Sequence, residues 1–308
     1  MSRLGTLFVA GAAVLAALAV GQPARGQATG NANERFVGKV PDSIVATVIA
    51  ERGLRVAYVV QRGKGQLVYA DSQPGPEYDG IRAGSLAFSP DGKHVAYVAQ
   101  RDTKQLMVVD GQPGPEYDGI GDRSPVFSPD GKHVGYVAQQ GKKQLVVLDG
   151  QPGPEYDGVR EGSPAFSPDG KCVLYMAQNG DKQLVVVNGQ PGPEYDRVGE
   201  GNLVLSPDGK HVAYTAQKGE RQLVVVDAKP GPEHDEVGAG SLVFRRDGRH
   251  VAYAAREGSR WRVVLDGQLG PGFDGIMKGG PAFRPDGSLE YLALRSDSLF
   301  RVQYRPRK

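Results

Sequence analysis

Hydrophobic and polar residues alternate in short stretches along the chain, and the same stretches return every 39 residues. In one such unit, residues 85–88 and 94–100 alternate, and residues 106–110 form a third apolar stretch. Alternation with a period of two is typical of β-strands that bury one face. The pattern therefore predicts that each unit is built from short strands, with Val95 and Tyr97 among the buried residues of its second strand.

Turn-forming residues separate these stretches at fixed places. Residues 89–92 read Ser-Pro-Asp-Gly, where proline presets φ and glycine accepts the left-handed conformation that a tight hairpin needs. Residues 111–115, Gly-Gln-Pro-Gly-Pro, are too rich in proline for a paired strand, so we expect a loop there. Residues 116–120, Glu-Tyr-Asp-Gly-Ile, are then expected to form a short polar fourth strand. Four antiparallel strands with evenly spaced turns are typical of one blade of a β-propeller.

The repeat occurs seven times between about Thr47 and Tyr304, and its first copy is degenerate. The last copy ends after its third strand, at residues 300–304, whereas residues 36–40, Phe-Val-Gly-Lys-Val, form a strand-like stretch ahead of the first copy. Placing residues 36–40 as the missing fourth strand would close a ring and hide two sheet edges. The sequence thus predicts an all-β fold, a seven-bladed β-propeller of four-stranded antiparallel blades closed by an N-terminal strand.

The first 26 residues differ from the repeats and resemble a secretory signal peptide. Arg3 precedes an apolar run over residues 7–20, and the small residues at 24 and 26 suit cleavage. The run is shorter than the roughly 20 residues that span a bilayer, so a membrane anchor is the weaker alternative. We expect a signal peptide at 1–26, a flexible lead at 27–34, the propeller at 35–304 and a tail at 305–308. The protein is therefore expected to be periplasmic or secreted.

Composition excludes several classes of partner and cofactor. A net charge of +2 over 308 residues provides no field that would gather nucleic acid. The single cysteine, Cys172, cannot form an intrachain disulfide, and nothing else in the sequence resembles a redox or metal centre. We therefore expect no cofactor, and we expect a monomer that does not span the membrane.

Residue types that could take part in catalysis or bind a metal recur at equivalent positions of the repeats, which argues against a catalytic or metal site. Cys172 occupies a position that other units fill with histidine, namely His94, His133, His211 and His250. Equivalent atoms on neighbouring blades are expected to lie roughly 8 Å or more apart, too far for ligands of one metal ion. The carboxylates of the repeated Glu-Tyr-Asp, as at residues 116–118, are expected on outermost strands, where charge discourages edge pairing. We predict no catalytic residue and no metal-binding residue.

The string Ser-Pro-Asp-Gly-Lys-His-Val-Ala-Tyr at residues 89–97 and 206–214 resembles the bacterial WD40-like repeat of TolB-type β-propellers. The resemblance covers nearly all of the chain after the signal peptide. It implies the propeller fold but no particular function. Peptidases of the prolyl oligopeptidase type also contain such propellers, but their hydrolase domain and its Gly-x-Ser-x-Gly elbow are missing from this sequence.

Differences between the units concentrate in the links between blades, which are expected on the face opposite the Pro-Asp-Gly turns. We predict a binding surface there for an envelope protein or peptide. Its residues are Arg82, Asp122, Arg123, Arg160, Glu161, Arg197, Glu200, Asn202 and Lys278. The outer hairpin loops on the same face are expected to add a mildly basic rim.

Two other functions stay open beside a binding or scaffolding module. An enzyme of lactonase or glycan-active type would place its site in the central channel. The first strands begin with small residues such as Ser85 and Ser124, and only Asn202 stands out among them, which weakens this alternative. A recently amplified repeat with little specific binding would fit the near-identity of the copies.

Overall fold

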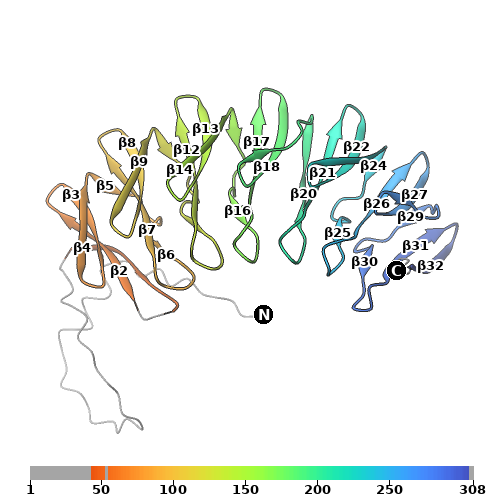
Figure 1. Ribbon diagram of the computed structural model, residues 1–308, viewed down its shortest axis with the longest axis horizontal. Helices are drawn as coiled ribbons and strands as arrows, with labels where there is room; N and C mark the ends of the chain where they lie inside the picture. Colours follow the sequence, from red (N-terminus) through yellow and green to blue (C-terminus); the bar gives the residue numbers. More distant parts are fainter. Residues whose placement is uncertain (1–42, 53–54, 305–308) are drawn as a thin grey trace, which may run out of the picture. The chain divides into compact units, whose positions relative to one another are not determined.

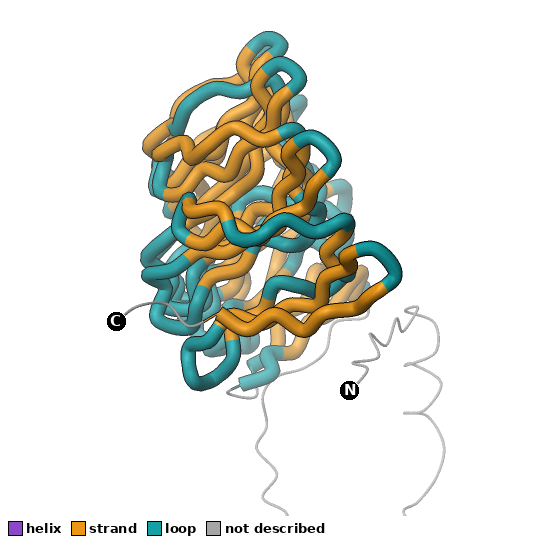
Figure 2. Tube along the Cα trace, turned by 90° about the vertical axis from the view of Figure 1, so that its right-hand side faces the viewer, coloured by secondary structure: helices purple, strands orange, loops and turns teal. Residues whose placement is uncertain are grey.

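The computed structural model describes residues 43–52 and 55–304, which form β-strands, turns and loops (Figure 1 and Figure 2). Within this part of the chain there is no helix that is long and apolar enough to cross a membrane. The chain divides into two compact units, one up to Pro125 and one from Val126 onward. The predicted signal peptide and the predicted closing strand at 36–40 lie outside the described residues.

The first unit contains two antiparallel sheets. The first sheet has the order β1-β2-β3-β4. In the second sheet the order is β5-β7-β8-β9, and β6 also pairs with β7. The strands of this unit are β1 (Ile44–Ile49), β2 (Val56–Arg62), β3 (Gly65–Ala70), β4 (Gln73–Tyr78), β5 (Gly80–Ile81), β6 (Ala87–Phe88), β7 (Val95–Arg101), β8 (Lys104–Val109), β9 (Gln112–Tyr117) and β10 (Gly119–Ile120).

The second unit contains five sheets of the same design. Their strands are β11 (Val126–Phe127), β12 (Val134–Gln140), β13 (Lys143–Leu148) and β14 (Gln151–Tyr156) in the first, and β15 (Gly158–Val159), β16 (Ala165–Phe166), β17 (Val173–Asn179), β18 (Lys182–Val187) and β19 (Gln190–Pro191) in the second. The third has β20 (Arg197–Leu205), β21 (Val212–Lys218), β22 (Arg221–Val226) and β23 (Lys229–His234). The fourth has β24 (Glu236–Val237), β25 (Val243–Phe244), β26 (Val251–Glu257), β27 (Arg260–Leu265) and β28 (Gln268–Leu269), and the last has β29 (Gly275–Ile276), β30 (Ala282–Phe283), β31 (Leu289–Arg295) and β32 (Ser298–Tyr304).

Residues 112–115 of the proline-rich segment belong to the paired strand β9, so the predicted loop was wrong. In β9, Gln112 lies opposite Val109 and Pro113 lies opposite Val108, and a bulge follows before the pairing resumes. Proline is tolerated because β9 is the outermost strand of its sheet, where a missing N–H need not break a ladder. The predicted fourth strand at 116–120 is also divided, since β9 ends at Tyr117 and β10 is a separate strand.

Neighbouring sheets within each unit pack through buried aliphatic side chains. Between the first two sheets, Val95, Tyr97 and Ala99 of β7 lie in one buried cluster with Ala57 and Val59 of β2, and all five are at most 4% exposed. The alternation read from the sequence therefore has a physical cause. In β7 the residues from Val95 to Ala99 are all buried, so side chains on both faces of this strand are covered.

Aromatic rings at the middle position of the Glu-Tyr-Asp motif and its variants lie edge-on against a tyrosine of the following sheet. Tyr78 is 3% exposed, and its ring centroid lies 6.4 Å from that of Tyr97. Such edge-to-face pairs contribute about 0.5–1.5 kcal/mol beyond the area that they bury. The equivalent pairs of the second unit are Tyr156–Tyr175, Tyr195–Tyr214, His234–Tyr253 and Phe273–Tyr291. The central residue of Glu-Tyr-Asp thus belongs to the core.

The aspartate of the same motif connects one sheet to the next. Asp157 accepts a hydrogen bond from the backbone N–H of Gly180 in the following sheet at 2.8 Å, and another from Lys143 Nζ at 2.7 Å. We call the set of these carboxylates the aspartate clasp, and its described members are Asp79, Asp157, Asp196, Asp235 and Asp274. The carboxylates that were predicted as exposed edge charges therefore hold neighbouring sheets together.

Protonation of the clasp is expected to weaken these contacts. The backbone N–H of Gly180 and the ammonium of Lys143 lower the pKa of Asp157, and a lysine and a backbone N–H lower that of Asp196. A depressed folded-state pKa stabilises the fold while the carboxylate is ionised. The contribution is complete above the unfolded pKa of about 3.9 and is lost as the pH falls through the lower folded values. We expect the Tm, measured by scanning calorimetry, to fall steeply below about pH 4.

A matched pair of variants assigns this acid sensitivity. The double substitution Asp157→Asn and Asp196→Asn keeps an oxygen acceptor but removes two titrating groups, so it should flatten the decline of Tm. Glu155→Gln, at an exposed neighbouring position, should leave the decline as it is. An unchanged slope in the double variant would show that the clasp does not carry the effect.

Candidate binding surface

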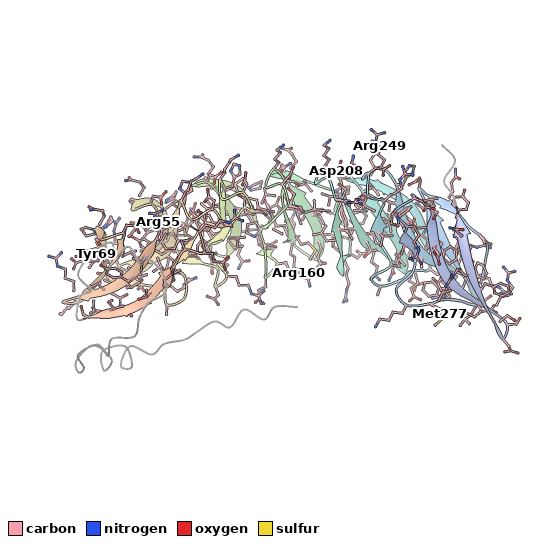
Figure 3. All side chains as sticks on the ribbon, turned by 90° about the horizontal axis from the view of Figure 1, so that it is seen from below. Arg55, Tyr69, Arg160, Asp208, Arg249 and Met277 are labelled. Atoms are coloured by element: carbon pink, nitrogen blue, oxygen red, sulfur yellow. The ribbon has the colours of Figure 1, made fainter. Side chains whose placement is uncertain are left out.

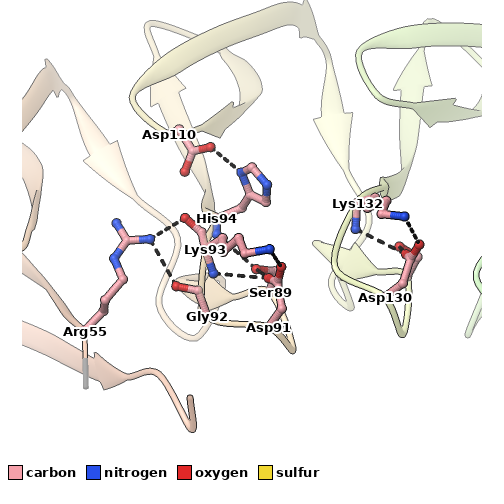
Figure 4. A network of polar contacts seen from close by, with 10 residues as sticks. Arg55, Ser89, Asp91, Gly92, Lys93, His94, Asp110, Asp130 and Lys132 are labelled. Atoms are coloured by element: carbon pink, nitrogen blue, oxygen red, sulfur yellow. Dashed lines mark hydrogen bonds and ion pairs between the residues drawn. The ribbon is translucent and has the colours of Figure 1, made fainter. Parts of the chain in front are cut away.

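The side chains of each Ser-Pro-Asp-Gly turn hold it in place (Figure 4). Ser89 Oγ donates to the Asp91 carboxylate at 2.6 Å, and the N–H of Lys93 donates to the same oxygen at 3.1 Å. These hydrogen bonds, that from Ser89 first, hold the pKa of Asp91 well below its usual range. Gly92 has a φ of 74°, and a Cβ there would lie 2.1 Å from the carbonyl oxygen of Arg52, so the position requires glycine.

Each repeated histidine pairs with an aspartate of its own sheet. His94 Nδ1 lies 2.6 Å from Asp110 Oδ2, and Asp110 Oδ1 accepts the N–H of Val95 at 2.9 Å. Where Cys172 replaces the histidine, Asn188 replaces the aspartate and still accepts a backbone N–H. The equivalent pairs are His133–Asp149, His211–Asp227 and His250–Asp266. Nowhere in the described part of the chain do three or more potential metal-binding side chains gather.

Two serines at the ends of links, Ser85 and Ser241, stabilise those links by hydrogen bonds. Ser85 Oγ donates to the carbonyl oxygen of Arg82 at 2.9 Å and accepts the N–H of Val98 at 3.0 Å. Ser241 makes the same two contacts, to Gly238 and from Ala254. These hydroxyls, which are buried, therefore close a turn and support the second strand.

In the second unit, the links and the Ser-Pro-Asp-Gly turns lie on opposite sides of the sheets. Figure 3 places Arg160 and Met277, both in links, on one side, and Asp208 and Arg249, beside the turns, on the other. The link at Arg160 is a tight turn, closed by the N–H of Ser163 donating to the Arg160 carbonyl at 3.2 Å. Link residues are therefore presented at the tips of short turns.

Arg82 holds the structure of the link that follows it. Its guanidinium donates to the carbonyl oxygens of Ile120 at 2.6 Å and Gly121 at 2.9 Å, and to the side chain of Gln105. The structure also brings it together with Asp122, at 3.8 Å, and leaves 21% of the Arg82 side chain exposed. Sequence reasoning could not anticipate this because the main partners are backbone carbonyls.

The other predicted binding residues occupy several links. Arg160 lines a small cavity of about 210 Å³ together with Gln178 and Gln183. Glu200 and Asn202 lie within β20, a continuous strand where most other sheets have a turn between two short strands. The predicted residues that are exposed in the structure are Asp122, Arg123, Glu161, Arg197 and Lys278.

The basic rim predicted for the outer loops is largely neutralised. Its cations pair with carboxylates of the Glu-Tyr-Asp motif and its variants. These pairs are Arg101–Glu116, Lys104–Asp118, Lys143–Asp157, Lys182–Asp196, Lys218–Glu233, Arg221–Asp235 and Arg260–Asp274. Exposed pairs of this kind contribute little stability individually, but they remove the field that a basic surface would need.

Some polar residues that replace core residues of the repeat are not apparent from the motifs of a single repeat. His234 stands where other repeats have tyrosine or, once, phenylalanine. It is fully buried, with Nε2 3.2 Å from the Tyr253 hydroxyl and Nδ1 3.2 Å from Glu257 Oε1. Burial, reinforced by Glu257, raises the pKa of Tyr253 to about 12. Comparing equivalent positions of the repeats would have revealed His234. The same comparison reveals a second group of polar residues in the last sheet.

No family model matches the chain, and none of the curated proteins compared with it is similar. Solved structures similar to it include TolB from Acinetobacter baumannii, at 21% identity over 70% of this chain and 62% of that chain, with a TM-score of 0.28. The Dos1 propeller is 10% identical over 85% of this chain and 77% of its own, with a TM-score of 0.33. The β-propeller domain of Cps50 (Swd1) from Myceliophteria thermophila is 12% identical over 86% and 100%, with a TM-score of 0.29. The chain thus spans less than two thirds of the TolB chain.

Proposed function

We propose that the chain is an exported β-propeller that acts as a binding or scaffolding module for a protein or peptide of the cell envelope. One observation carries the proposal. Charged side chains that differ between units, such as Arg123, Glu161 and Lys278, are exposed in tight links on an otherwise repeated frame. Variable loops positioned by a rigid scaffold are a common way to build a binding surface. Export rests on the signal-like residues 1–26.

Affinity capture from a cell-envelope extract tests this proposal. A variant carrying Arg123→Glu, Arg160→Glu and Lys278→Glu reverses charge in the links, and Arg82 is left unchanged because it holds a neighbouring link. We expect a specific partner, quantified by mass spectrometry, to be retained by the original protein and reduced at least about tenfold by the variant.

A control variant separates the links from surface charge in general. Lys64→Glu and Lys142→Glu reverse two exposed cations in the outer hairpin loops. They should leave capture unchanged. Equal loss in both variants, or capture of nothing specific by the original protein, would contradict a binding surface at the links.

A further inference from the structure

The last sheet carries a charged cluster that the other sheets lack. Arg284 Nε lies 2.6 Å from Glu290 Oε2, and Arg301 Nε lies 3.2 Å from Glu290 Oε1. Each carboxylate oxygen of Glu290 therefore holds a different guanidinium. The Glu290 side chain is 15% exposed, whereas the arginines are 54% and 74% exposed. The carboxylate thus forms the floor of the cluster, and the two guanidinium groups lie above it.

The repeat itself does not account for these charges. At the position of Glu290 the other six sheets have a buried small or apolar residue, and these are Ala57, Ala96, Gly135, Leu174, Ala213 and Ala252. At the position of Arg301 they also have buried apolar residues, and these are Val68, Met107, Val146, Val185, Val224 and Val263. Departures from a consistent local pattern are expected where a sequence serves a function besides folding.

These charged side chains line a cavity of about 220 Å³, which Lys278 also borders. Both guanidinium groups contact Glu290 through Nε, and each arginine has four further N–H donors on its Nη atoms. With Lys278, the cavity has three cations and one carboxylate, so its net charge favours an anion. Hydrogen bonding from Arg284 lowers the pKa of Glu290, which keeps this carboxylate ionised and both arginines in place near neutral pH.

We propose that this cavity is a binding site for an oxyanion group, a carboxylate or a phosphate, held by the Nη donors of Arg284 and Arg301. Planar guanidinium groups match the paired oxygens of carboxylate and phosphate and bind them with two hydrogen bonds. Glu290 acts as a positioning residue that orients both guanidinium groups, and Lys278 adds charge at the border. The site does not depend on the module binding a protein at its links.

Calorimetric titration of the purified full chain with sodium succinate and with inorganic phosphate tests the site. Sodium chloride at matched ionic strength corrects for screening. We expect saturable binding of at least one probe, and the probe that binds identifies the group as carboxylate or phosphate. Arg284→Ser and Arg301→Met install residues that the repeat uses at these positions, so folding should be retained. Each substitution should raise the Kd at least about tenfold.

Arg245→Ser is the matched control because Arg245 occupies the position of Arg284 in the preceding sheet and pairs with Asp247. It should leave the Kd unchanged. The proposal is overturned if neither probe saturates, or if Arg245→Ser weakens binding as much as Arg284→Ser. It is also overturned if Arg284→Ser and Arg301→Met change the Tm but not the Kd, since the charges would then serve folding.

Discussion

Replacing Leu223 with alanine is expected to lower the free energy of unfolding by about 2–5 kcal/mol. Leu223 lies in β22, is 2% exposed, and packs in one cluster with Tyr195, Tyr214 and Val225. The substitution removes apolar contacts and leaves a cavity between two sheets that are tightly stacked. The surrounding strands are tied by their ladders and cannot collapse fully into the space.

Chemical denaturation measures this effect as a shift of the unfolding midpoint. Leu269→Ala is the control, since Leu269 is 47% exposed in β28 and should change stability by no more than about 0.5 kcal/mol. If the two variants unfold at the same midpoint, the buried cluster around Leu223 does not contribute to the free energy of unfolding as its burial implies.

Deleting residues 36–40 is expected to lower the Tm by about 5–10 °C and to promote association. The physical reason lies in β32. Its described pairing is with β31, on one edge, whereas β22, the equivalent strand of another sheet, pairs on both edges, with β21 and β23. Leu299 and Phe300 of β32 are 58% and 39% exposed. If 36–40 is the missing fourth strand, its loss leaves that edge and these side chains uncovered.

A second deletion of equal length provides the comparison. Residues 29–33 lie in the stretch predicted as a flexible lead, and their removal should leave the Tm and the elution volume unchanged. Scanning calorimetry and size-exclusion chromatography report the two properties. If both deletions behave alike, residues 36–40 do not complete a sheet, and the predicted ring closure is wrong.

Most strands could be predicted from the sequence because their signal is local. The alternation of apolar and polar residues predicted the positions of β7 and β8. The Asp-Gly pair predicted the hairpin turn before β7. The fourth strand was misjudged because the argument against proline applies to central strands, whereas Gln112 and Pro113 lie on an edge. Proline content alone does not tell whether a strand has a neighbour on both sides.

The candidate surface was less predictable because the relevant partners are distant in sequence. Arg82 appeared to be a free link residue, but its hydrogen bonds run to carbonyl oxygens at residues 120 and 121, which have no side-chain signature. The pairing of His94 with Asp110 was readable, since the same spacing recurs in four units. Glu290 and Arg301 become visible only when equivalent positions of all units are compared.

The aspartate clasp also bears on how such a chain grows in evolution. Each acceptor lies in one 39-residue repeat and its backbone donor lies in the next repeat, 23 residues later for Asp157 and Gly180. A recombination event that duplicates or removes one whole repeat therefore adds or removes one acceptor and one donor together. Every remaining junction between repeats then still has both groups. Because the donor is a main-chain N–H, it survives side-chain drift in the receiving loop. Copy number can then change in single genetic steps without prior adaptation of the neighbours.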